Sequence, residues 1–241
     1  MDNHYINPKL VRLYDLDSGW SVEREFYLSL AGDQPKNVLD LGCGTGLICN
    51  ALAAKGHNVT GADPAGAMLD AAKAKPNGTR IDWVQSTAQN FKSDKLFDLI
   101  IMTGNAFQVF LKEADLQKTF QVMATHLKPS GLIAFETRNP SLDWKDQWDY
   151  DVELKTPEGS VFESRRCLHW DRIHLRFELR YRFPHEELIS QSELRFWSPE
   201  EIEAQLTEAG LYVERLMGDW NYADLNRKFA KEMIFFLRKK A

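Results

Sequence analysis

The stretch NVLDLGCGTG, Asn37 to Gly46, decides the fold of this chain. Its first half is a short run of β-branched residues and leucine, and its second half has a glycine at every other position. The segment LICNALAAKG that follows has apolar residues at helical spacing and ends at Gly56, a typical helix stop. This pattern predicts a strand, a tight glycine turn and a helix.

The same alternation of strands and helices continues to about residue 138. Predicted strands fall at 37–42, 57–63, 80–85, 97–102 and 132–137, the last after a KPSG turn at 128–131. Strands that alternate with helices indicate a doubly wound parallel sheet with right-handed crossovers. Ligands of such sheets bind beyond the carboxyl ends of the strands, near the point where the strand order reverses.

Asp63 ends the second predicted strand, nineteen positions after Gly44. A carboxylate at this distance from a glycine turn can accept hydrogen bonds from both vicinal hydroxyls of a ribose. The glycine turn and Asp63 together therefore predict that a nucleoside binds here.

The spacing of the glycines narrows the choice of nucleoside. The chain reads D-x-G-x-G-x-G from Asp40 to Gly46, whereas dinucleotide sites read G-x-G-x-x-G and leave a helix N-terminus free for pyrophosphate. The carboxylate of Asp40 beside the turn would repel a diphosphate and attract the ammonium group of an amino acid. S-adenosylmethionine is a ribonucleoside with a cationic amino-acid tail and no phosphate.

At this point the sequence resembles the class I S-adenosylmethionine-dependent methyltransferases. The resemblance rests on VLDLGCGTG, GAD (61–63), FDLIIM and LKPSGLIAFE, and it covers residues 35–138. It implies a Rossmann-like methyltransferase fold, with a doubly wound, mostly parallel sheet of seven strands.

The resemblance also implies the residues that hold the cofactor, S-adenosyl-L-methionine. Gly42 and Gly44 would let the backbone approach the methionine part, Asp40 would support that site, and Asp63 would hold the ribose. Met68 would lie against the adenine, whose amino group would meet Gln89 or a backbone carbonyl. The full set implied is Tyr14, Asp40, Gly42, Cys43, Gly44, Asp63, Pro64, Met68, Ala88, Gln89 and Thr103, with no metal.

Composition limits the partners. Thirty Lys and Arg against thirty-five Asp and Glu give a net charge of −5, which does not favour nucleic acid. The N-terminus lacks the basic and then apolar pattern of a secretion signal, and no stretch is long and apolar enough to span a membrane, so we expect a cytoplasmic protein. We expect it to be a monomer or a homodimer. Three cysteines without metal or disulfide spacing fit a reducing compartment. The motifs of DNA base methyltransferases are missing, and we therefore expect a small-molecule methyl acceptor.

The rest of the chain predicts an antiparallel cap. RIHLRFELRYRF, 172–183, alternates strictly, with Ile173, Leu175 and Phe177 beginning its apolar face. With the neighbouring segments it predicts three antiparallel strands inserted after the fifth core strand. The domains expected are an N-terminal helical segment of two helices (1–34), a cofactor-binding core (35–138), a cap that binds substrate (139–197), and a C-terminal helix and strands that complete the core sheet (198–241).

Several features of the cap and the N-terminus have two interpretations. Six arginines against three acidic residues in 160–183 fit either recruitment of an acidic substrate or a solvated sheet face. The tryptophans of the second half fit either a substrate pocket or ordinary packing. Tyr14 and Trp20 are candidates for closing the site or for plain packing.

Methyl transfer depends mainly on positioning, and a base is needed only for an acceptor that is protonated. Candidates for the catalytic residues are Asn105 after the fourth strand, Arg138 at the end of the fifth as a carboxylate-binding or orienting group, and His174 in the cap. Glu136 and His169 are further candidates. Two other functions stay open, an NAD(P)-dependent oxidoreductase and a noncatalytic module that binds a nucleoside.

Overall fold

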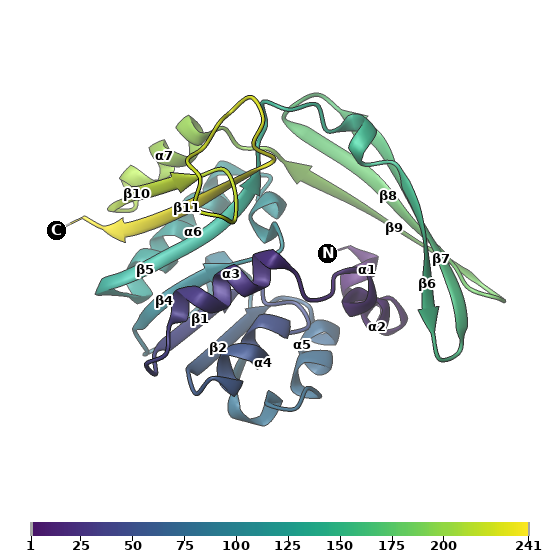
Figure 1. Cartoon of the computed structure of the whole chain (residues 1–241), viewed down its shortest axis with the longest axis horizontal. Coiled ribbons are helices and arrows are strands. Elements are labelled where there is room, and N and C mark those ends of the chain that lie inside the picture. Colours follow the sequence, from purple (N-terminus) through teal and green to yellow (C-terminus); the bar gives the residue numbers. More distant parts are fainter. Residues whose placement is uncertain (1, 241) are drawn as a thin grey trace.

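The chain forms an α/β core with a second, antiparallel sheet beside it (Figure 1). The computed structural model describes residues 2–240, so the outermost residue of each predicted terminal segment, Met1 and Ala241, lies outside the described residues. The core strands are β1 (Asn37–Leu41), β2 (Asn58–Asp63), β3 (Asp82–Gln85), β4 (Phe97–Met102), β5 (Leu127–Arg138), β10 (Leu211–Met217) and β11 (Glu232–Lys239).

The core sheet runs in the order β10-β11-β5-β4-β1-β2-β3. β1 pairs in parallel with both β2 and β4, so the strand order reverses at β1. β11 runs antiparallel to β5 and to β10. The predicted fold, a doubly wound and mostly parallel sheet of seven strands, is confirmed.

Helices cover both faces of this sheet (Figure 1). On one face, apolar residues of the sheet pack with those of three helices, α3 (Val22–Ala31), α4 (Leu47–Ala54) and α5 (Gly66–Lys73). On the other face, they form a second cluster with α6 (Glu113–His126) and α7 (Pro199–Glu208). In the second cluster the rings of Phe107, Phe135 and Phe235 stack, with centroids 4.4 Å and 5.0 Å apart. Each is fully buried, and burial of one such ring contributes roughly 1.5–3 kcal/mol to folding.

Strand β5 begins earlier than predicted. Leu127 pairs with Phe97 and Leu132 pairs with Leu99, so residues 128–131, predicted as a turn, lie in an irregular part of the strand between these pairs. Pro129 lacks the N–H that a regular ladder needs, and strand irregularities accommodate such residues. The KPSG sequence thus marks a local irregularity, and strand pairing continues on both sides of it.

The cap is a four-stranded antiparallel sheet in the order β6-β7-β8-β9 (Tyr150–Thr156, Gly159–Trp170, His174–Arg182 and Glu187–Arg195). The prediction of three strands was wrong because it missed β6. The alternation of Tyr150, Val152 and Leu154 with charged residues is a strand signal, but it is only seven residues long.

The predicted apolar face of β8 packs inward. Leu175, Phe177, Leu179 and Tyr181 are all buried in the cluster of the cap. Ile173, predicted on the same face, is 49% exposed. It precedes the strand and follows Arg172, whose φ of 76° turns the chain out of the alternation.

Three helices, not the predicted two, precede the core, because α1 (Asn3–Ile6) and α2 (Pro8–Asp17) come before α3. The Asn7 side chain caps α2 by accepting a hydrogen bond from the Lys9 N–H. The Ser21 side chain caps α3 by accepting a hydrogen bond from the Arg24 N–H. α1 and α2 lie between the core and the cap (Figure 1), and Nδ1 of His4 lies 2.9 Å from the Ser190 hydroxyl of β9. The short 3₁₀ helices of the described residues are η1 (Gly78–Arg80), η2 (Ala88–Asn90), η3 (Ala106–Val109) and η4 (Lys145–Gln147).

Candidate active site

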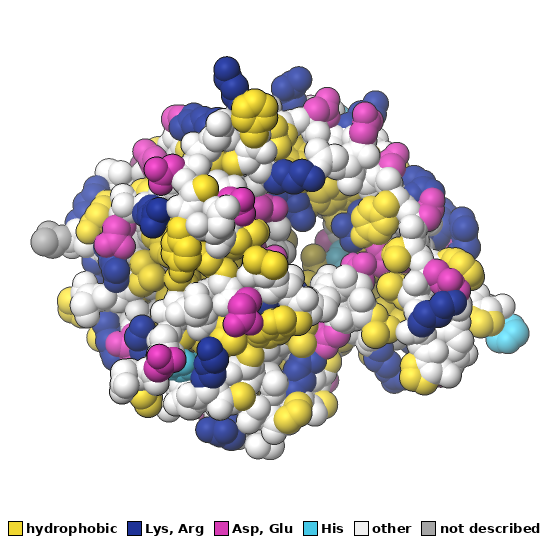
Figure 2. Space-filling model, viewed as in Figure 1, with side chains coloured by type: hydrophobic (Ala, Val, Ile, Leu, Met, Phe, Trp, Pro, Cys, Tyr) yellow, Lys and Arg dark blue, Asp and Glu magenta, His cyan; other side chains and the backbone are white. Residues whose placement is uncertain are grey.

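A cavity of about 260 Å³ lies between the carboxyl ends of the core strands and the inner face of the cap. Figure 2 shows the hollow between these two parts from outside. Residues after β1, β2, β4 and β5 form one wall, β7, β8 and β9 form the opposite wall, and α1 and α2 close a third side. The reversal of strand order at β1 therefore opens into a cavity that is bounded on three sides.

The glycine turn after β1 forms the floor of this cavity. Gly42, Gly44 and Gly46 have φ values of 79°, 52° and 70°, a backbone region that glycine adopts without strain. The N–H of Gly42 donates to Ala62 of β2 over 2.7 Å, which fixes the turn to the sheet. A β-carbon on Gly44 would have 3.9 Å to its nearest neighbour, on Tyr14, and would point into space that a ligand can use.

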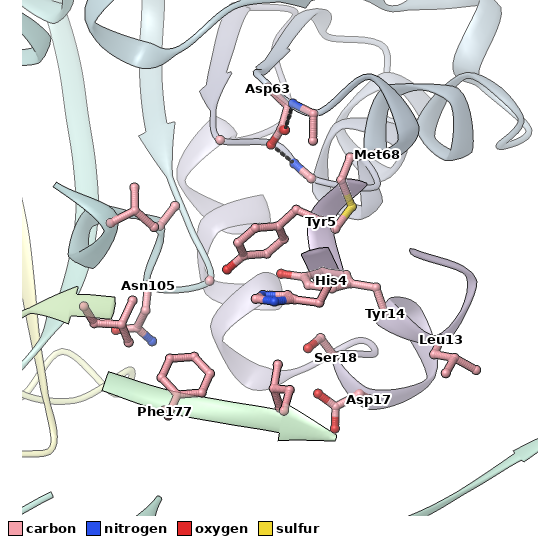
Figure 3. Close-up of a pocket in the computed structure, with 18 of the residues that line it drawn as sticks. His4, Tyr5, Leu13, Tyr14, Asp17, Ser18, Asp63, Met68, Asn105 and Phe177 are labelled. Carbon is pink, nitrogen blue, oxygen red and sulfur yellow. Dashed lines mark hydrogen bonds between the residues drawn. The ribbon is translucent and has the colours of Figure 1, made fainter. Parts of the chain in front are cut away.

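Asp63 joins the glycine turn to the end of β2 (Figure 3). One carboxylate oxygen accepts from the Gly44 N–H over 2.9 Å, and the other accepts from the Ala65 N–H over 2.8 Å. Burial raises the pKa of Asp63, and these two hydrogen bonds oppose the rise. Asp63 and Gly44 line the cavity, as Gly42 and Pro64 also do.

Asp40 is fully buried and does not line the cavity. The thiol of Cys49 donates to one of its oxygens over 3.3 Å, and the other oxygen has no partner within residues 2–240. Burial raises its pKa to about 7. Cys43, also predicted as a cofactor contact, packs its side chain into the core and is likewise absent from the lining. Both therefore lie behind the turn.

Met68 of α5 and Tyr14 of α2 line the cavity together, as the prediction requires. Tyr5 of α1 joins them, with its ring centroid 6.4 Å from that of Tyr14 (Figure 3). The sequence analysis missed Tyr5, which is separated from the core motifs and belongs to a four-residue helix. Trp20 is 49% exposed and donates to Glu25, so it does not face the cavity.

Ala88 and Gln89, the predicted adenine contacts, lie on η2 after β3. Neither lines the cavity. The end of β3 is tied to β2 by the Ser86 N–H, which donates to the Asp63 carbonyl over 3.2 Å. The predicted adenine contacts are thus next to the site in the chain but outside its lining.

The loop after β4 brings Thr103 and Asn105 into the lining. Asn105 has a φ of 57°, and its N–H donates to the buried carboxyl of Glu136 over 2.5 Å. The hydroxyl of Tyr27 donates to the other oxygen of Glu136. Burial raises the pKa of Glu136 well above its ordinary value, and the hydrogen bonds from Tyr27 and Asn105 oppose the rise. Through these two bonds the carboxyl joins the loop after β4 to Tyr27.

Arg138 lines the cavity at the end of β5. Its guanidinium carbon lies 4.8 Å from the centre of the Trp148 ring and 5.7 Å from that of Trp144. Nη1 donates to Oε1 of the buried Gln108 over 2.6 Å. Trp148 is one of the tryptophans of the second half for which the sequence left a substrate pocket and ordinary packing open, and the structure places it in the lining. The support from Gln108 was not predicted, because glutamine at this position carries no motif.

Glu163 and Arg165 of β7 form the facing part of the cap wall. Arg165 lies 3.6 Å from Glu163 and 3.9 Å from Asp17 of α2. The Tyr150 hydroxyl lies 3.3 Å from one oxygen of Glu163, and the other oxygen is buried with no partner within the described part of the chain. Burial raises the pKa of Glu163, helped by the charge of Asp17. Sequence reasoning counted these residues only as part of a charged face.

His174 and His169 lie outside the lining. His174 Nδ1 is 3.7 Å from Asp171, and His169 Nε2 is 3.3 Å from the same carboxylate. All three side chains are more than a third exposed or close to it. Of the three predicted catalytic residues, the fold thus brings Asn105 and Arg138 to the cavity and leaves His174 on the outside.

Among residues 2–240, no cluster of three His, Cys, Asp or Glu side chains could hold a metal ion. Within the same range, every helix is too short or too polar to cross a membrane.

Comparison with known proteins identifies the domain to which the core is similar. Residues 38–131 match the family model of the methyltransferase domain. A ubiquinone biosynthesis O-methyltransferase of Rickettsia canadensis (strain McKiel) is 38% identical over 104 residues, which span 42% of each chain. The chain thus covers less than half the length of this relative. The resemblance to class I S-adenosylmethionine-dependent methyltransferases is confirmed for the core.

Solved structures extend the likeness to the cap. An S-adenosylmethionine-dependent methyltransferase from Clostridium acetobutylicum ATCC 824 superposes with a TM-score of 0.79 at 18% identity, covering 97% of this chain and 98% of that one. The sugar N-methyltransferase KedS8 from Streptoalloteichus sp ATCC 53650 gives 0.76 at 20% identity, covering 94% and 93%. At these identities the likeness establishes the fold.

Proposed function

We propose that this protein transfers the methyl group of S-adenosylmethionine to a small-molecule acceptor held beneath the cap. The observation that carries the proposal is the hydrogen bond from the Gly44 N–H to Asp63 at the floor of the cavity between core and cap. It joins the glycine turn and the acidic residue that a phosphate-free nucleoside requires. The match of residues 38–131 to the methyltransferase domain supports the same conclusion.

The core wall would hold the cofactor. Asp63 would accept the ribose hydroxyls, and Gly42 and Gly44 would let the methionine part approach the backbone. Met68 would contact the adenine, with Tyr14 closing over the cofactor from α2. Asp40 would act from behind, by holding the turn in place and by adding negative charge near the ammonium group.

The cap wall would hold the acceptor. When bound, S-adenosylmethionine supplies an electrophilic methyl group whose leaving group is a neutral thioether, so orientation can supply much of the rate. Asn105 and Arg138 would orient the acceptor from the core side. Glu163 has an unpartnered oxygen and a raised pKa, and it could take a proton from an amine or hydroxyl acceptor.

The chain would therefore divide its work among four segments. Residues 35–138 bind the cofactor, 139–197 form the acceptor wall, 1–34 close the cavity, and 198–241 complete the sheet. The acceptor atom stays open, since the Rickettsia relative is named as an O-methyltransferase and KedS8 as a sugar N-methyltransferase.

Thermal unfolding of the protein with S-adenosylmethionine, S-adenosylhomocysteine, NAD and NADP in parallel tests the proposal. Ligand at 100 times its dissociation constant stabilises a fold by about 2.7 kcal/mol, and a chain of this size shifts by roughly 2–4 °C per kcal/mol. We expect a rise with the two sulfur nucleosides alone. A rise with NAD or NADP instead would replace this function with that of an oxidoreductase, and binding without methyl release to any acceptor would favour a noncatalytic module.

A further inference from the structure

Arg138 has hydrogen-bonding capacity that no described residue uses. A guanidinium has five N–H donors, and here one of them, on Nη1, bonds to Gln108. The Nε and Nη2 groups, which form one edge of the planar group, make no hydrogen bond within residues 2–240. Arg138 lines the cavity, so a ligand can reach it.

Two more donors beside this guanidinium lack acceptors. Nε1 of Trp148, whose ring lies 4.8 Å from the guanidinium carbon, is buried without a partner among the described residues. So is Nε2 of Gln108, whose amide oxygen bonds to Arg138. Buried polar groups are nearly always paired, and Trp148 lines the same cavity. A group that only accepts hydrogen bonds would satisfy this corner.

Arg138 also lacks a carboxylate partner. No Asp or Glu oxygen between residues 2 and 240 lies within 4 Å of its guanidinium, whereas Arg165 across the cavity has Glu163 and Asp17 within that distance. Glu232, its neighbour across the β5–β11 ladder, influences Arg138 by charge but forms no ion pair. Burial lowers the pKa of Arg138, as expected for a cation that needs a counter-charge.

We infer that the methyl acceptor carries a carboxylate, which the free edge of Arg138 and the indole N–H of Trp148 bind together. A carboxylate is planar, anionic and accepts hydrogen bonds at two oxygens, so it matches that edge in a bidentate arrangement. Gln108 and the two tryptophan rings hold the guanidinium in place. The inference rests on the proposed function, because it gives the class of acceptor for that reaction.

A different cation acts by its charge on the part of the site predicted for the cofactor. Burial raises the pKa of Asp40 and of Tyr14, and in both cases the charge of Arg24 opposes the shift. Arg24 does not line the cavity, but its charge reaches these two residues beside the glycine turn. The charges that influence Arg138 are instead those of Glu232 and Arg165, followed by Glu136 and Glu23.

Calorimetric binding of matched probes tests the inference without turnover. Benzoate is compared with benzamide, and 3-phenylpropionate with 3-phenylpropionamide, on protein saturated with S-adenosylhomocysteine. The variants are Arg138→Gln, which removes the charge, and Arg138→Lys, which keeps the charge but loses the planar fork. The matched control is Arg195→Gln, because Arg195 also stacks on a tryptophan, 3.4 Å from the Trp197 ring centre, but is paired with Glu113 and Glu201 outside the cavity.

We expect the wild-type protein to prefer each carboxylate by about 10- to 100-fold over its amide, as for a lost charged hydrogen bond. Arg138→Gln should abolish the preference, Arg138→Lys should reduce it, and Arg195→Gln should leave it unchanged. The inference fails if the wild-type protein shows no preference, or if the preference survives in Arg138→Gln. It also fails if Arg138→Gln weakens S-adenosylhomocysteine binding to the same extent, since the anion would then belong to the cofactor.

Failure of the proposed function would be seen separately, as absence of S-adenosylhomocysteine binding in the wild-type protein. The same probe pairs are then measured on the unliganded protein. A carboxylate preference that depends on Arg138 would still support an anion site, and its absence would overturn it.

Discussion

Two parts of the cavity use their polar groups in different ways. At the floor, both oxygens of Asp63 accept backbone N–H groups, and the turn at Gly42 is bonded to β2. Where the end of β5 meets the cap, Trp148 and Glu163 have buried polar atoms without partners among the described residues, and Arg138 has a free edge. The floor is held by backbone hydrogen bonds, whereas the side that faces the cap has side-chain donors and acceptors still to be paired.

This difference fits two kinds of ligand. A cofactor that is the same in every turnover can be met by a rigid backbone turn, which costs little reorganisation on binding. An acceptor is recognised by side chains whose pairing it completes, and a molecule without the matching group leaves them unpaired, which gives strong discrimination. If the cofactor and acceptor parts of the cavity are independent, a substitution that weakens binding of one ligand should leave binding of the other unchanged.

The largest effect is expected at Gly46, which packs the turn against the core. A β-carbon there would lie 2.5 Å from the Trp83 ring and 2.9 Å from the Ala72 side chain, at a φ of 70°. Left-handed strain of about 1–2 kcal/mol and overpacking of about 1–3 kcal/mol should together cost Gly46→Val about 2–5 kcal/mol of unfolding free energy. Urea denaturation measures it.

Gly44→Val is the matched control in the same turn. Its β-carbon would enter the cavity instead of the core, so the fold should lose only the strain of about 1–2 kcal/mol, while S-adenosylmethionine binding is abolished. Retained affinity with an intact fold would mean that the turn does not face the cofactor.

Asp40 should make the core wall sensitive to pH. Its pKa is about 7 in the folded chain and 3.8 in the unfolded chain, so the folded state holds the proton between these values and stability falls as pH rises from 4 to 7. Asp40→Asn cannot ionise and should be more stable than wild type by on the order of 3 kcal/mol at pH 8, with little difference at pH 4. Denaturation curves at both pH values check it, and equal differences would show that Asp40 does not titrate in this window.

Asp63→Ala should affect ligand binding more than folding. Loss of a charge-assisted acceptor should weaken S-adenosylmethionine binding by about 1–3 kcal/mol, measured by calorimetry. The carboxylate preference at Arg138 should be unchanged in this variant if the cofactor and acceptor parts of the cavity are independent. An unchanged dissociation constant would contradict the ribose assignment.

The smallest effect is expected where α1 meets the cap. Ser190→Ala removes the hydroxyl that accepts the backbone N–H of the buried His4 and lies beside its Nδ1, and loss of each such hydrogen bond costs about 1 kcal/mol. Because α1 closes the cavity, hydrogen exchange in residues 3–17 should rise in this variant while exchange in β1 and β4 stays the same. A uniform increase over the whole chain would mean that α1 is not a separate unit.

Part of the lining of the core wall could be predicted from the sequence. Gly42, Gly44, Asp63 and Met68 lie on the cavity because each follows a strand whose period and boundaries are written locally in the chain. Asp40 and Cys43 were predicted by the same motif, but the packing of α4 and β2 places them behind the turn. A motif fixes the chain path and does not by itself tell which side chains reach the ligand.

The sequence by itself determined the sheet, the glycine turn, the acidic residue at the end of β2 and the presence of an antiparallel cap. These features follow from hydrophobic period and turn chemistry, which act over a few residues. Only the tertiary structure decided that Arg138 meets Trp148 and Gln108, that Glu163 faces the cavity, and that His174 does not. Such contacts join segments far apart in the chain, and they depend on how the cap and the N-terminal helices close over the core.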